Sequence, residues 1–550
     1  MHSFSNLHRQ ETLEILQRET FDLLVLGGGI TGAGIALDAA SRGLRVALIE
    51  KGDFASGTSS KSTKLIHGGL RYLKQFDFWL VKEVGTERAI LHQLAPHLVV
   101  PEKMILPIIE DGTYGTWLTS IGLKVYDLLA SVEGDDKRKM LDRETAVKKE
   151  PLLDETDLEG AGYYAEYRTD DARLTIEVLK TAGANGATAV NYCEAEGFIR
   201  KDDRITGVVA RDSIGEKQLR INTRLVVNAA GPWVDDIREE LDATGIRGKR
   251  LQPTKGVHLV FPREKLPVRQ SIYFDVPDGR MIFAIPRGKV TYVGTTDTKY
   301  FGDPDAVATD LADALYLISA VNNMFPDAGL KLEDVQSSWA GLRPLIYEEG
   351  KTASELSRKD EIFESGSGLV SIAGGKLTGY RKMAERTVDL ACKRLQKSHD
   401  SNCGKVQTET IPLTPDPFAD YGAVKAYEKD VLQTLEPYGF GPTEVQILVH
   451  RFGRALNPIM DKFMALPEED FRVRMARAQL WFCVQHEMVI TPLDFFERRT
   501  GMLYFEAPEI EILKDPILLE FQKIFGWNAE ILKKNEEILE TALYHSRHFT

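Results

Sequence analysis

The chain has 550 residues, of which 43% are hydrophobic and 27% are charged, and its 69 basic and 82 acidic residues give a net charge of −13 at pH 7. These values are typical of a soluble globular protein of several domains, and they exclude a disordered, collagen-like or coiled-coil chain. The acidic balance argues against nonspecific binding to nucleic acids, although local Lys and Arg side chains can still bind a small anion.

The sequence carries little sign of disulfides, metals or a membrane span. No Cys-x-x-Cys pair occurs, so we expect neither a disulfide scaffold nor a zinc or iron–sulfur site, and a reducing cytosol fits best. Residues 1–20 are polar and charged, and no stretch reaches the ~18 uncharged apolar residues of a membrane helix. We expect a cytoplasmic protein with no bound metal, either soluble or attached peripherally to the inner face of the cell membrane. The widely spaced cysteines are Cys193, Cys392, Cys403 and Cys483.

Residues 21–50 carry the strongest structural signal. The apolar run at 21–26 predicts a short buried strand, the Ala-rich stretch at 30–41 predicts a helix, and 45–49 predicts a second buried strand that ends at Glu50. Together they make a βαβ unit of about the 30 residues expected of that motif. A Rossmann-like α/β fold is therefore predicted.

The turn between the first strand and the helix contains Gly27-x-Gly29-x-x-Gly32. The first glycine permits a tight turn, the second lets a pyrophosphate approach the backbone, and the third lets helix and strand pack closely. The N-terminus of the helix offers free N–H groups and the positive end of its dipole to phosphates. Glu50, 18 residues past Gly32, stands where a carboxylate would accept hydrogen bonds from an adenosine ribose. The pattern predicts a dinucleotide site.

The middle of the chain alternates between helix and strand before a β-rich stretch. Residues 175–187 predict a helix and 225–228 a buried strand, and the turn at 286–289 joins two strands of a predicted hairpin. We therefore expect an antiparallel sheet inserted into an α/β framework. The β-rich segments are 257–261, 281–285 and 290–293.

Three later segments have the character of contacts to one long cofactor. The turn at 57–62 is rich in hydroxyl groups, and the strands that lead into 228–233 and 372–378 both break into glycine and other small residues where a ligand can approach. Because these segments are spread along most of the chain, FAD fits them better than NAD. The candidate cofactor contacts are Gly27, Gly29, Thr31, Gly32, Glu50, Lys51, Thr58, Ser59, Ser60, His67, Gly68, Ala229, Ala230, Gly231, Gly374, Gly375, Lys376, Leu377 and Thr378.

Several sequence blocks are shared with a known family. They are the glycine motif with Glu50, the hydroxyl-rich turn, Ile66-His-Gly-Gly-Leu-Arg-Tyr72, Asn228-Ala-Ala-Gly231, Gly341-Leu-Arg-Pro344 and Gly374-Gly-Lys-Leu-Thr-Gly-Tyr-Arg381. Together they resemble the FAD-dependent glycerol-3-phosphate dehydrogenase family, and the match covers nearly the whole chain. Many flavoproteins share the first motif, whereas His-Gly-Gly-Leu-Arg-Tyr and Gly-Gly-Lys-Leu-Thr are much more specific.

The domain organisation follows from this resemblance and from a linker. Three prolines within 411–417 mark the linker, and the composition beyond it is helical. We expect an oxidoreductase region at 1–410, with an FAD-binding domain of the glutathione-reductase and D-amino-acid-oxidase type, and a C-terminal α-helical domain at 411–550. The FAD-binding segments are expected at about 18–110, 160–250 and 335–400, and the substrate sheet at about 250–335.

The resemblance also implies a reaction. It implies oxidation of sn-glycerol 3-phosphate to dihydroxyacetone phosphate, with the C2 hydrogen leaving as hydride to flavin N5 and a base taking the proton of the C2 hydroxyl. The electrons then pass to a quinone at a membrane. The expected partners are this small substrate and a quinone, without nucleic acid, and a homodimer is compatible with the sequence.

A phosphate dianion needs fixed cations with directed donors, and arginine is the best such partner. Arg71 and Arg343 each follow a glycine-rich or apolar approach, which suits a charge aimed inward. Tyr72 would donate to a phosphate oxygen, and Lys376 would lie near the flavin or the substrate, where it could stabilise a reduced flavin anion. The predicted substrate contacts are therefore Arg71, Tyr72, Arg343 and Lys376.

His67 is the natural candidate for the general base, because an imidazole titrates near working pH. A histidine beside two glycines can equally be a structural hydrogen bonder, and Arg343 or a lysine could instead stabilise an alkoxide. Lys255 begins the inserted sheet and is expected to reach the substrate from the opposite side. His258, further along that strand, is expected to be packed or exposed. The predicted catalytic residues are His67, Arg343, Lys255 and Lys376.

Other functions stay open at this point. The nearest is an oxidase that uses oxygen and releases hydrogen peroxide, although such relatives typically carry an inserted segment that this chain lacks. An amino-acid oxidase of the same fold would need fewer cations, and a flavoprotein that acts on RNA conflicts with the net charge of −13. The amphipathic stretch 113–129 would suit a membrane interface, a buried helix or a dimer contact.

Overall fold

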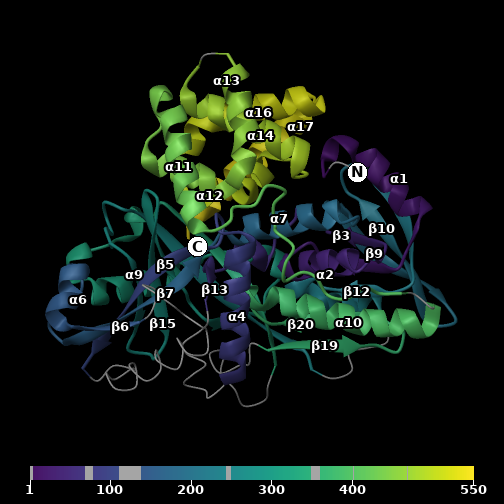
Figure 1. Cartoon of the computed structure of the whole chain (residues 1–550), viewed down its shortest axis with the longest axis horizontal. Helices are drawn as coiled ribbons and strands as arrows, with labels where there is room; N and C mark the ends of the chain where they lie inside the picture. Colours follow the sequence, from purple (N-terminus) through teal and green to yellow (C-terminus); the bar gives the residue numbers. More distant parts are fainter. Residues whose placement is uncertain are drawn as a thin grey trace.

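A computed structural model describes residues 4–67, 78–110, 138–242, 249–347, 359–399, 402–467 and 469–549. Three sheets and a group of C-terminal helices make up this part of the chain (Figure 1). Within it, no helix combines the length and the apolar character needed to cross a membrane. The predicted amphipathic stretch 113–129 lies outside the described residues.

A six-stranded sheet contains the predicted βαβ unit. In spatial order its strands are β19 (Asp360–Glu364), β20 (Val370–Gly374), β12 (Val226–Asn228), β2 (Leu23–Leu26), β3 (Val46–Ile49) and β8 (Thr188–Val190). All neighbours pair in parallel except the edge strand β19, which runs antiparallel to β20. The carboxyl ends of β2, β12 and β20 therefore meet at one edge, the place where open α/β sheets bind ligands.

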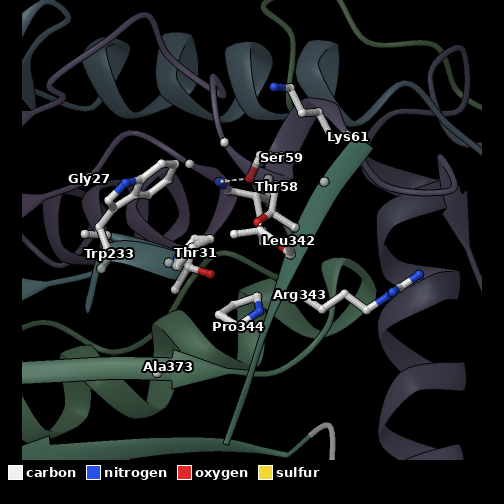
Figure 2. Close-up of a pocket in the computed structure, with 18 of the residues that line it drawn as sticks. Gly27, Thr31, Thr58, Ser59, Lys61, Trp233, Leu342, Arg343, Pro344 and Ala373 are labelled. Carbon is white, nitrogen blue, oxygen red and sulfur yellow. Dashed lines mark hydrogen bonds between the residues drawn. The ribbon is translucent and has the colours of Figure 1, made fainter. Parts of the chain in front are cut away.

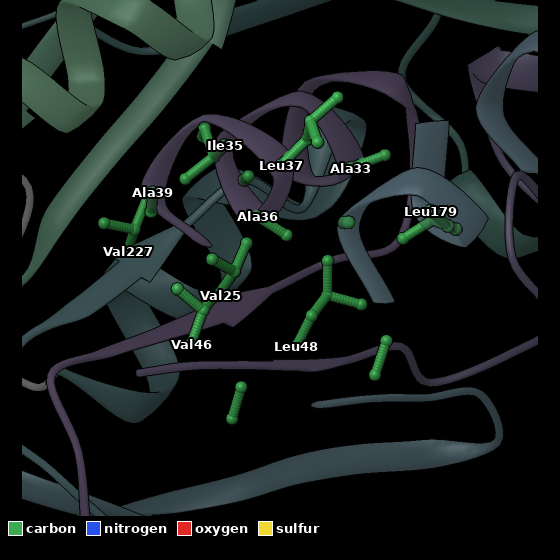
Figure 3. Close-up of a cluster of buried hydrophobic side chains, with 14 of the residues drawn as sticks. Val25, Ala33, Ile35, Ala36, Leu37, Ala39, Val46, Leu48, Leu179 and Val227 are labelled. Atoms are coloured by element: carbon green, nitrogen blue, oxygen red, sulfur yellow. The ribbon is translucent and has the colours of Figure 1, made fainter. Parts of the chain in front are cut away.

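Small side chains let a helix pack tightly beside this sheet. The helix α2 (Ile30–Ser41) contacts both α7 (Asp171–Ala184) and α10 (Tyr380–His399) there. In Figure 3 the side chains of Val25, Leu48 and Val227 from the strands gather beneath Ile35 and Ala36 of α2. This buried cluster fixes where the N-terminus of α2 points, and with it the glycine turn.

The second large sheet has ten strands in the described chain. In spatial order eight of them are β17 (Thr298–Lys299), β13 (Leu251–Pro262), β16 (Val290–Gly294), β15 (Met281–Arg287), β14 (Ser271–Asp275), β5 (Val100–Ile109), β7 (Leu158–Arg168) and β4 (Leu65–Ile66), while β18 (Ser337–Ile346) pairs with β13 and β6 (Lys139–Asp142) with β7. The three predicted strands lie within β13, β15 and β16 and run antiparallel, as predicted. The sheet also contains strands that precede the predicted insertion (β4, β5, β6 and β7) and one that follows it (β18).

The remaining elements frame these two sheets. A small sheet contains β1 (Thr20–Phe21), β11 (Lys217–Thr223), β10 (Arg204–Asp212) and β9 (Cys193–Lys201), and further helices are α1 (Arg9–Arg18), α4 (Phe78–Leu94), α6 (Arg143–Lys149), α8 (Val234–Asp236) and α9 (Leu311–Met324). Short single-turn helices include η2 (Thr58–Ser60), η4 (Gly231–Trp233) and η9 (Leu377–Gly379). All three of these turns lie in the predicted cofactor segments.

The chain beyond the proline-rich linker is helical, as the sequence predicts. Its helices are α11 (Tyr421–Leu435), α12 (Pro442–Phe452), α13 (Leu456–Ala465), α14 (Phe471–His486), α15 (Met502–Phe505), α16 (Ala507–Phe525) and α17 (Ala529–Arg547), with a π-helix, η12, at Asp494–Arg499. They form a cap at the top of Figure 1. One buried hydrophobic cluster joins these helices to β15, β16 and β18. The cap therefore shares a hydrophobic core with the ten-stranded sheet, called the substrate sheet below.

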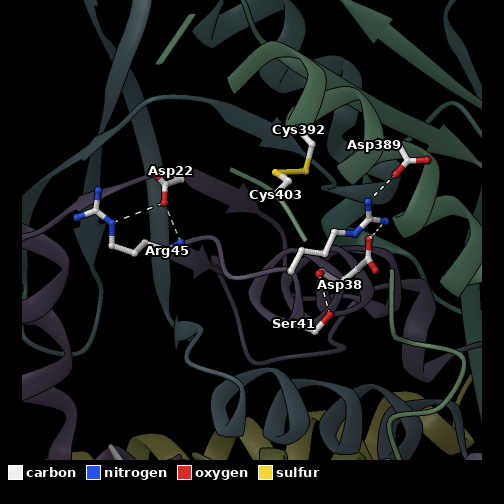
Figure 4. Close-up of a disulfide and its surroundings, with 8 residues drawn as sticks. Asp22, Asp38, Ser41, Arg45, Asp389, Cys392 and Cys403 are labelled. Atoms are coloured by element: carbon white, nitrogen blue, oxygen red, sulfur yellow. Dashed lines mark hydrogen bonds and ion pairs between the residues drawn. A yellow bond between two sulfur atoms is a disulfide. The ribbon is translucent and has the colours of Figure 1, made fainter. Parts of the chain in front are cut away.

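One disulfide corrects the expectation drawn from cysteine spacing. Cys392 on α10 is bonded to Cys403, 11 residues later, with their Cα atoms 5.9 Å apart (Figure 4). After α10 the chain turns back, so that Cys403 lies beside Cys392 of that helix. The next residue, Gly404, donates its N–H to the carbonyl of Arg42 at 2.9 Å. Spacing along the sequence did not reveal this return. The other cysteines, Cys193 and Cys483, are buried free thiols.

Three histidines whose rings are largely shielded from water make the folded state sensitive to acid. Burial lowers the pKa of His97 to about 3 and that of His450 to about 4, and it holds the pKa of His258 well below 6.5. Each unfolded imidazole therefore binds a proton more readily than the folded one, so stability is full above pH 6.5 and falls as the pH drops towards the folded pKa. Between about pH 6 and 4.5 we expect the free energy of unfolding to fall by about 1.4 kcal/mol per pH unit for each histidine.

Urea unfolding at a series of pH values checks this expectation. His97→Gln removes one of the three groups, so the slope of unfolding free energy against pH should decrease by about 1.4 kcal/mol per pH unit. An unchanged slope in this variant would show that His97 does not contribute.

Candidate functional site

The predicted cofactor segments surround one elongated cavity of about 470 Å³. It runs along the carboxyl ends of β2, β12 and β20 and continues beneath β13 and β18 of the substrate sheet. In Figure 2, Trp233 and Gly27 lie at one end of the residues drawn, and Arg343 extends from β18 at the other end. The cavity therefore has two chemically distinct ends.

Two positions of the glycine turn require glycine, because their backbone lies against other backbone atoms. A Cβ atom on Gly32 would lie 1.9 Å from the carbonyl oxygen of Gly27, and Gly27 itself has a φ of +108° that favours glycine. A Cβ on Gly27 would also lie 2.7 Å from the carbonyl oxygen of Ala229. The absence of side chains thus lets the first turn of α2 pack directly on the glycine turn, and the Ile30 N–H at its start donates to the Ser59 hydroxyl at 2.9 Å.

Polar groups at the same end of the cavity suit an adenosine. The Glu50 carboxylate accepts hydrogen bonds from the N–H groups of Gly28 at 2.6 Å and Gly52 at 2.9 Å, which leaves lone pairs on both oxygens for a ribose. Burial raises the pKa of this carboxyl despite those two donors. Among the described residues the buried indole N–H of Trp233 has no hydrogen-bond acceptor, so a bound polar group would satisfy it. Lys51 lies 4.4 Å from the centre of the Trp233 ring.

Arg343 supplies the cation at the opposite end. Its guanidinium donates to the Thr295 hydroxyl at 3.0 Å, to the carbonyl of Thr296 at 3.3 Å and to the Asp297 carboxylate at 3.3 Å. A Cβ on Gly256, on the neighbouring strand β13, would lie 2.4 Å from the guanidinium, so only glycine leaves room for it there. Several directed contacts thus hold the charge at the cavity wall.

His258 is packed, as the sequence predicts, but it also lines the cavity beside Arg343, which the sequence did not predict. Its ring stacks on Trp339 with centroids 4.7 Å apart, and its Nε2 lies 3.0 Å from the Thr63 hydroxyl. Burial, with the charges of Arg343 and Lys64, holds its pKa well below 6.5. The imidazole is therefore neutral, and its buried Nδ1 has no partner in the described part of the chain.

His67 and Lys376 also line the cavity. The carbonyl of His67 accepts a hydrogen bond from the Thr378 hydroxyl at 3.4 Å, and its ring lies 6.0 Å from that of Phe283. Lys376 stands between β20 and η9, where two glycines of positive φ, Gly374 and Gly375, turn the chain. Both residues are thus placed where the sequence predicts, and their catalytic roles stay predictions.

Lys255 lies outside the cavity, in contrast to its predicted role. Side chains alternate across a strand, so Lys255 faces away from the side that carries Gly256 and His258. Its ammonium group pairs with Asp310 and Asp313 at the start of α9, each at 2.6 Å. These two carboxylates satisfy the charge, and the structure does not bring Lys255 to the substrate end.

The other predicted site residues divide into three groups. Gly32 and Ser60 are buried and do not line the cavity, and the Ser60 hydroxyl donates to the Gly57 carbonyl at 3.4 Å. Gly68, Arg71 and Tyr72 lie outside the described residues. The predicted cofactor contacts that line the cavity are Gly27, Gly29, Thr31, Glu50, Lys51, Thr58, Ser59, His67, Ala229, Ala230, Gly231, Gly374, Gly375, Lys376, Leu377 and Thr378.

Comparison with known families agrees with this geometry. A family profile described as FAD dependent oxidoreductase matches residues 22–381, and one described as the C-terminal domain of alpha-glycerophosphate oxidase matches residues 407–531. The first profile covers the segments that surround the cavity, and the second covers most of the helical cap.

Individual relatives match over their full length. The chain is 45% identical to the aerobic glycerol-3-phosphate dehydrogenase of Bacillus subtilis (strain 168), over 99% of this chain and 98% of that protein. It is 44% identical to the protein of the same name from Staphylococcus aureus (strain USA300), again over 99% and 98%.

Solved structures show the same fold. The glycerol-3-phosphate dehydrogenase from Bacillus halodurans complexed with FAD has a TM-score of 0.84 and 41% identity, with 99% of both chains covered. The dithionite-reduced L-alpha-glycerophosphate oxidase from Mycoplasma pneumoniae with FAD bound, at 17% identity and a TM-score of 0.54, shares the fold over 73% of this chain and 98% of that one. The chain belongs to the FAD-dependent oxidoreductase family, in the group that contains the aerobic glycerol-3-phosphate dehydrogenases.

Proposed function

We propose that the protein oxidises sn-glycerol 3-phosphate to dihydroxyacetone phosphate and passes the electrons to a quinone. The observation that carries the proposal is Arg343, a directed cation at the end of the FAD cavity farthest from Trp233. The names of the relatives support the substrate, because they are called glycerol-3-phosphate dehydrogenases.

The chain's own residues would bind and orient the substrate. Arg343 is a bidentate donor suited to phosphate, and Lys376 adds a second cation in the same cavity. The resemblance adds Arg71 and Tyr72 to this set. A phosphate held at this end directs the C2 carbon towards the middle of the cavity. There FAD, when bound, supplies the acceptor for the C2 hydride.

Removal of the C2 hydroxyl proton requires a base, and two histidines line the cavity. His67 is the base favoured by the sequence, and His258 is the alternative that the geometry adds. A substrate phosphate would neutralise Arg343, and this would raise the pKa of His258 because the Arg343 charge is one cause of its low value. Substrate binding would thus make His258 a better base at the moment of reaction.

Two single variants separate the bases. Replacing the true base, His67→Asn or His258→Asn, should lower kcat by about 10²- to 10⁴-fold, because positioned general bases contribute that much. The other substitution should leave kcat within about tenfold of wild type, a range below that expected of a general base. Anaerobic stopped-flow bleaching of the flavin measures the step directly. Equal, small effects from both variants would indicate that neither histidine takes the proton.

Anaerobic reduction and readmission of air test the function as a whole. Addition of sn-glycerol 3-phosphate without oxygen should bleach the flavin absorbance, and a quinone analogue should then restore it. The match of the cap to the C-terminal domain of an alpha-glycerophosphate oxidase favours one second candidate, an oxidase that reduces oxygen. Fast reoxidation in air with stoichiometric hydrogen peroxide would support that oxidase, and no bleaching at all would exclude the substrate.

A further inference from the structure

We propose that Asp53 is a positioning residue through which the helical cap holds FAD in its cavity. Asp53 belongs to the cofactor loop, defined here as residues 51–63, which supplies much of the cavity wall. The loop residues that line the cavity are Lys51, Ser56, Gly57, Thr58, Ser59, Lys61, Ser62 and Thr63. The proposal concerns FAD binding, so it does not depend on the identity of the substrate.

The carboxylate of Asp53 points away from the cavity and into the cap. Arg499 donates to both of its oxygens, at 2.7 and 2.9 Å, and Arg498 donates a further hydrogen bond at 2.6 Å. Asn191 donates a fourth at 2.9 Å. Burial alone would raise the pKa of this carboxyl, but the two arginines outweigh it and lower the pKa to about 2. Asp53 is thus charged and fully hydrogen-bonded.

The two arginines come from an unusual element of the cap. They end the π-helix Asp494–Arg499, and π-helical turns occur frequently at functional sites. Arg499 is fully buried and Arg498 is 5% exposed. A buried ion pair gains little net stability over apolar packing, because desolvation of the charges offsets their attraction. We infer that the cluster fixes the position of the loop more than it stabilises the fold.

The two residues that follow Asp53 contact the glycine turn directly. The Ala55 N–H donates to the carbonyl of Gly28 at 3.1 Å. The ring of Phe54 fills the space beside the same glycine, where a Cβ on Gly28 would lie 2.6 Å from the ring. Because Phe54 is fully buried, a shift of Asp53 must displace either the ring or the turn. The cap therefore supports the pyrophosphate turn through a connection of two residues.

A second buried ion pair in the same interface provides a matched control. Glu487 of the cap accepts a bidentate pair from Arg173 of α7, at 2.6 and 2.8 Å, and both residues are buried. The side chain of Glu487 makes no hydrogen bond to the cofactor loop in the described chain. Its backbone carbonyl accepts from Arg499, and Glu487→Gln keeps that carbonyl, so the substitution changes only side-chain contacts, chiefly the pair with Arg173. Loss of this pair should weaken the attachment of the cap without moving the glycine turn.

The experiment measures FAD release and unfolding of the full-length holoenzyme for Asp53→Asn and Glu487→Gln. Both variants should lower the unfolding midpoint. Only Asp53→Asn should raise the dissociation constant of FAD, by roughly tenfold, as read from the fluorescence of released flavin. Arg499→Lys keeps the charge but loses the planar fork, so it should give an intermediate value and replaces Asp53→Asn if that variant does not fold.

Two outcomes would overturn the proposal. In the first, Asp53→Asn or Arg499→Lys lowers the unfolding midpoint while FAD dissociates as from wild type, which makes the cluster a purely structural contact. In the second, Glu487→Gln increases FAD release as much as the loop variants do, which makes the effect one of general destabilisation.

Discussion

Arg343→Ala should lower kcat/KM for sn-glycerol 3-phosphate by about 30- to 4,000-fold, because truncating one partner of a buried charged hydrogen-bond pair costs about 2–5 kcal/mol. The loss should appear mainly as a higher KM if Arg343 only binds the phosphate. It should also lower kcat if Arg343 orients the C2 carbon of the substrate towards the flavin. The truncation also removes the ion pair between the Arg343 guanidinium and the Asp297 carboxylate, whose nitrogen and oxygen lie 3.3 Å apart. Initial rates with a soluble quinone analogue give both constants.

Glycerol provides the control substrate, because it lacks the phosphate that Arg343 is proposed to bind. Any oxidation of glycerol by the wild-type protein should change little in Arg343→Ala. Arg250→Ala is the matched variant: Arg250 pairs with Glu239 and is 63% exposed, so its loss should leave both substrates unaffected. A loss of the same size for glycerol as for glycerol 3-phosphate would contradict the assignment of Arg343 as the phosphate anchor.

Gly32→Ala should yield protein that is purified largely without flavin. The new methyl group would lie 1.9 Å from the Gly27 carbonyl oxygen, so α2 or the turn must move by more than 1 Å. Displacements of this size can cost about 100-fold in affinity or rate, and overpacking in the core costs a further ~1–3 kcal/mol of stability. The ratio of absorbance at flavin and protein wavelengths measures the bound FAD, and titration with FAD gives its dissociation constant.

Gly197→Ala is the control for this effect. Gly197 lies in β9 and a Cβ there meets no atom within 4 Å, so it should keep full flavin content. If Gly32→Ala retained flavin with wild-type affinity, the close packing of α2 on the turn would not be required for cofactor binding.

The sequence predicted those features that depend on local pattern. Short apolar runs mark buried parallel strands, so β2, β3 and β12 were predictable, and the glycines after β2 made the turn at Gly27 predictable as well. Contacts between strands far apart in sequence carry no such local signal. His258 illustrates this: only the pairing of β13 with β18 brings Trp339 beside it and places its ring in the cavity.

The prediction for Lys255 shows a second limit. A motif identifies which residues are unusual but not which face of the strand they occupy, and a shift of one residue moves a side chain to the opposite face. Strand alternation places Lys255 and His258 on opposite faces of β13. Lys255 therefore lies outside the cavity, whereas His258 is packed, as predicted, but at the cavity wall. The ion cluster at Asp53 was also beyond prediction, since its arginines lie more than 400 residues further along the chain.

The order of strands in the six-stranded sheet has a consequence for synthesis of the protein. Its central strand β2 ends at Leu26, but one of its neighbours, β12, begins at Val226 and the next strand, β20, only at Val370. The ribosome must therefore produce about two thirds of the chain before this sheet can close, and pairings so distant in sequence form slowly. Until then the early strands expose unpaired edges, which favour aggregation. Because FAD binds only the closed sheet, free FAD should shift newly made chains towards the native state, and riboflavin supply should limit the yield of folded protein.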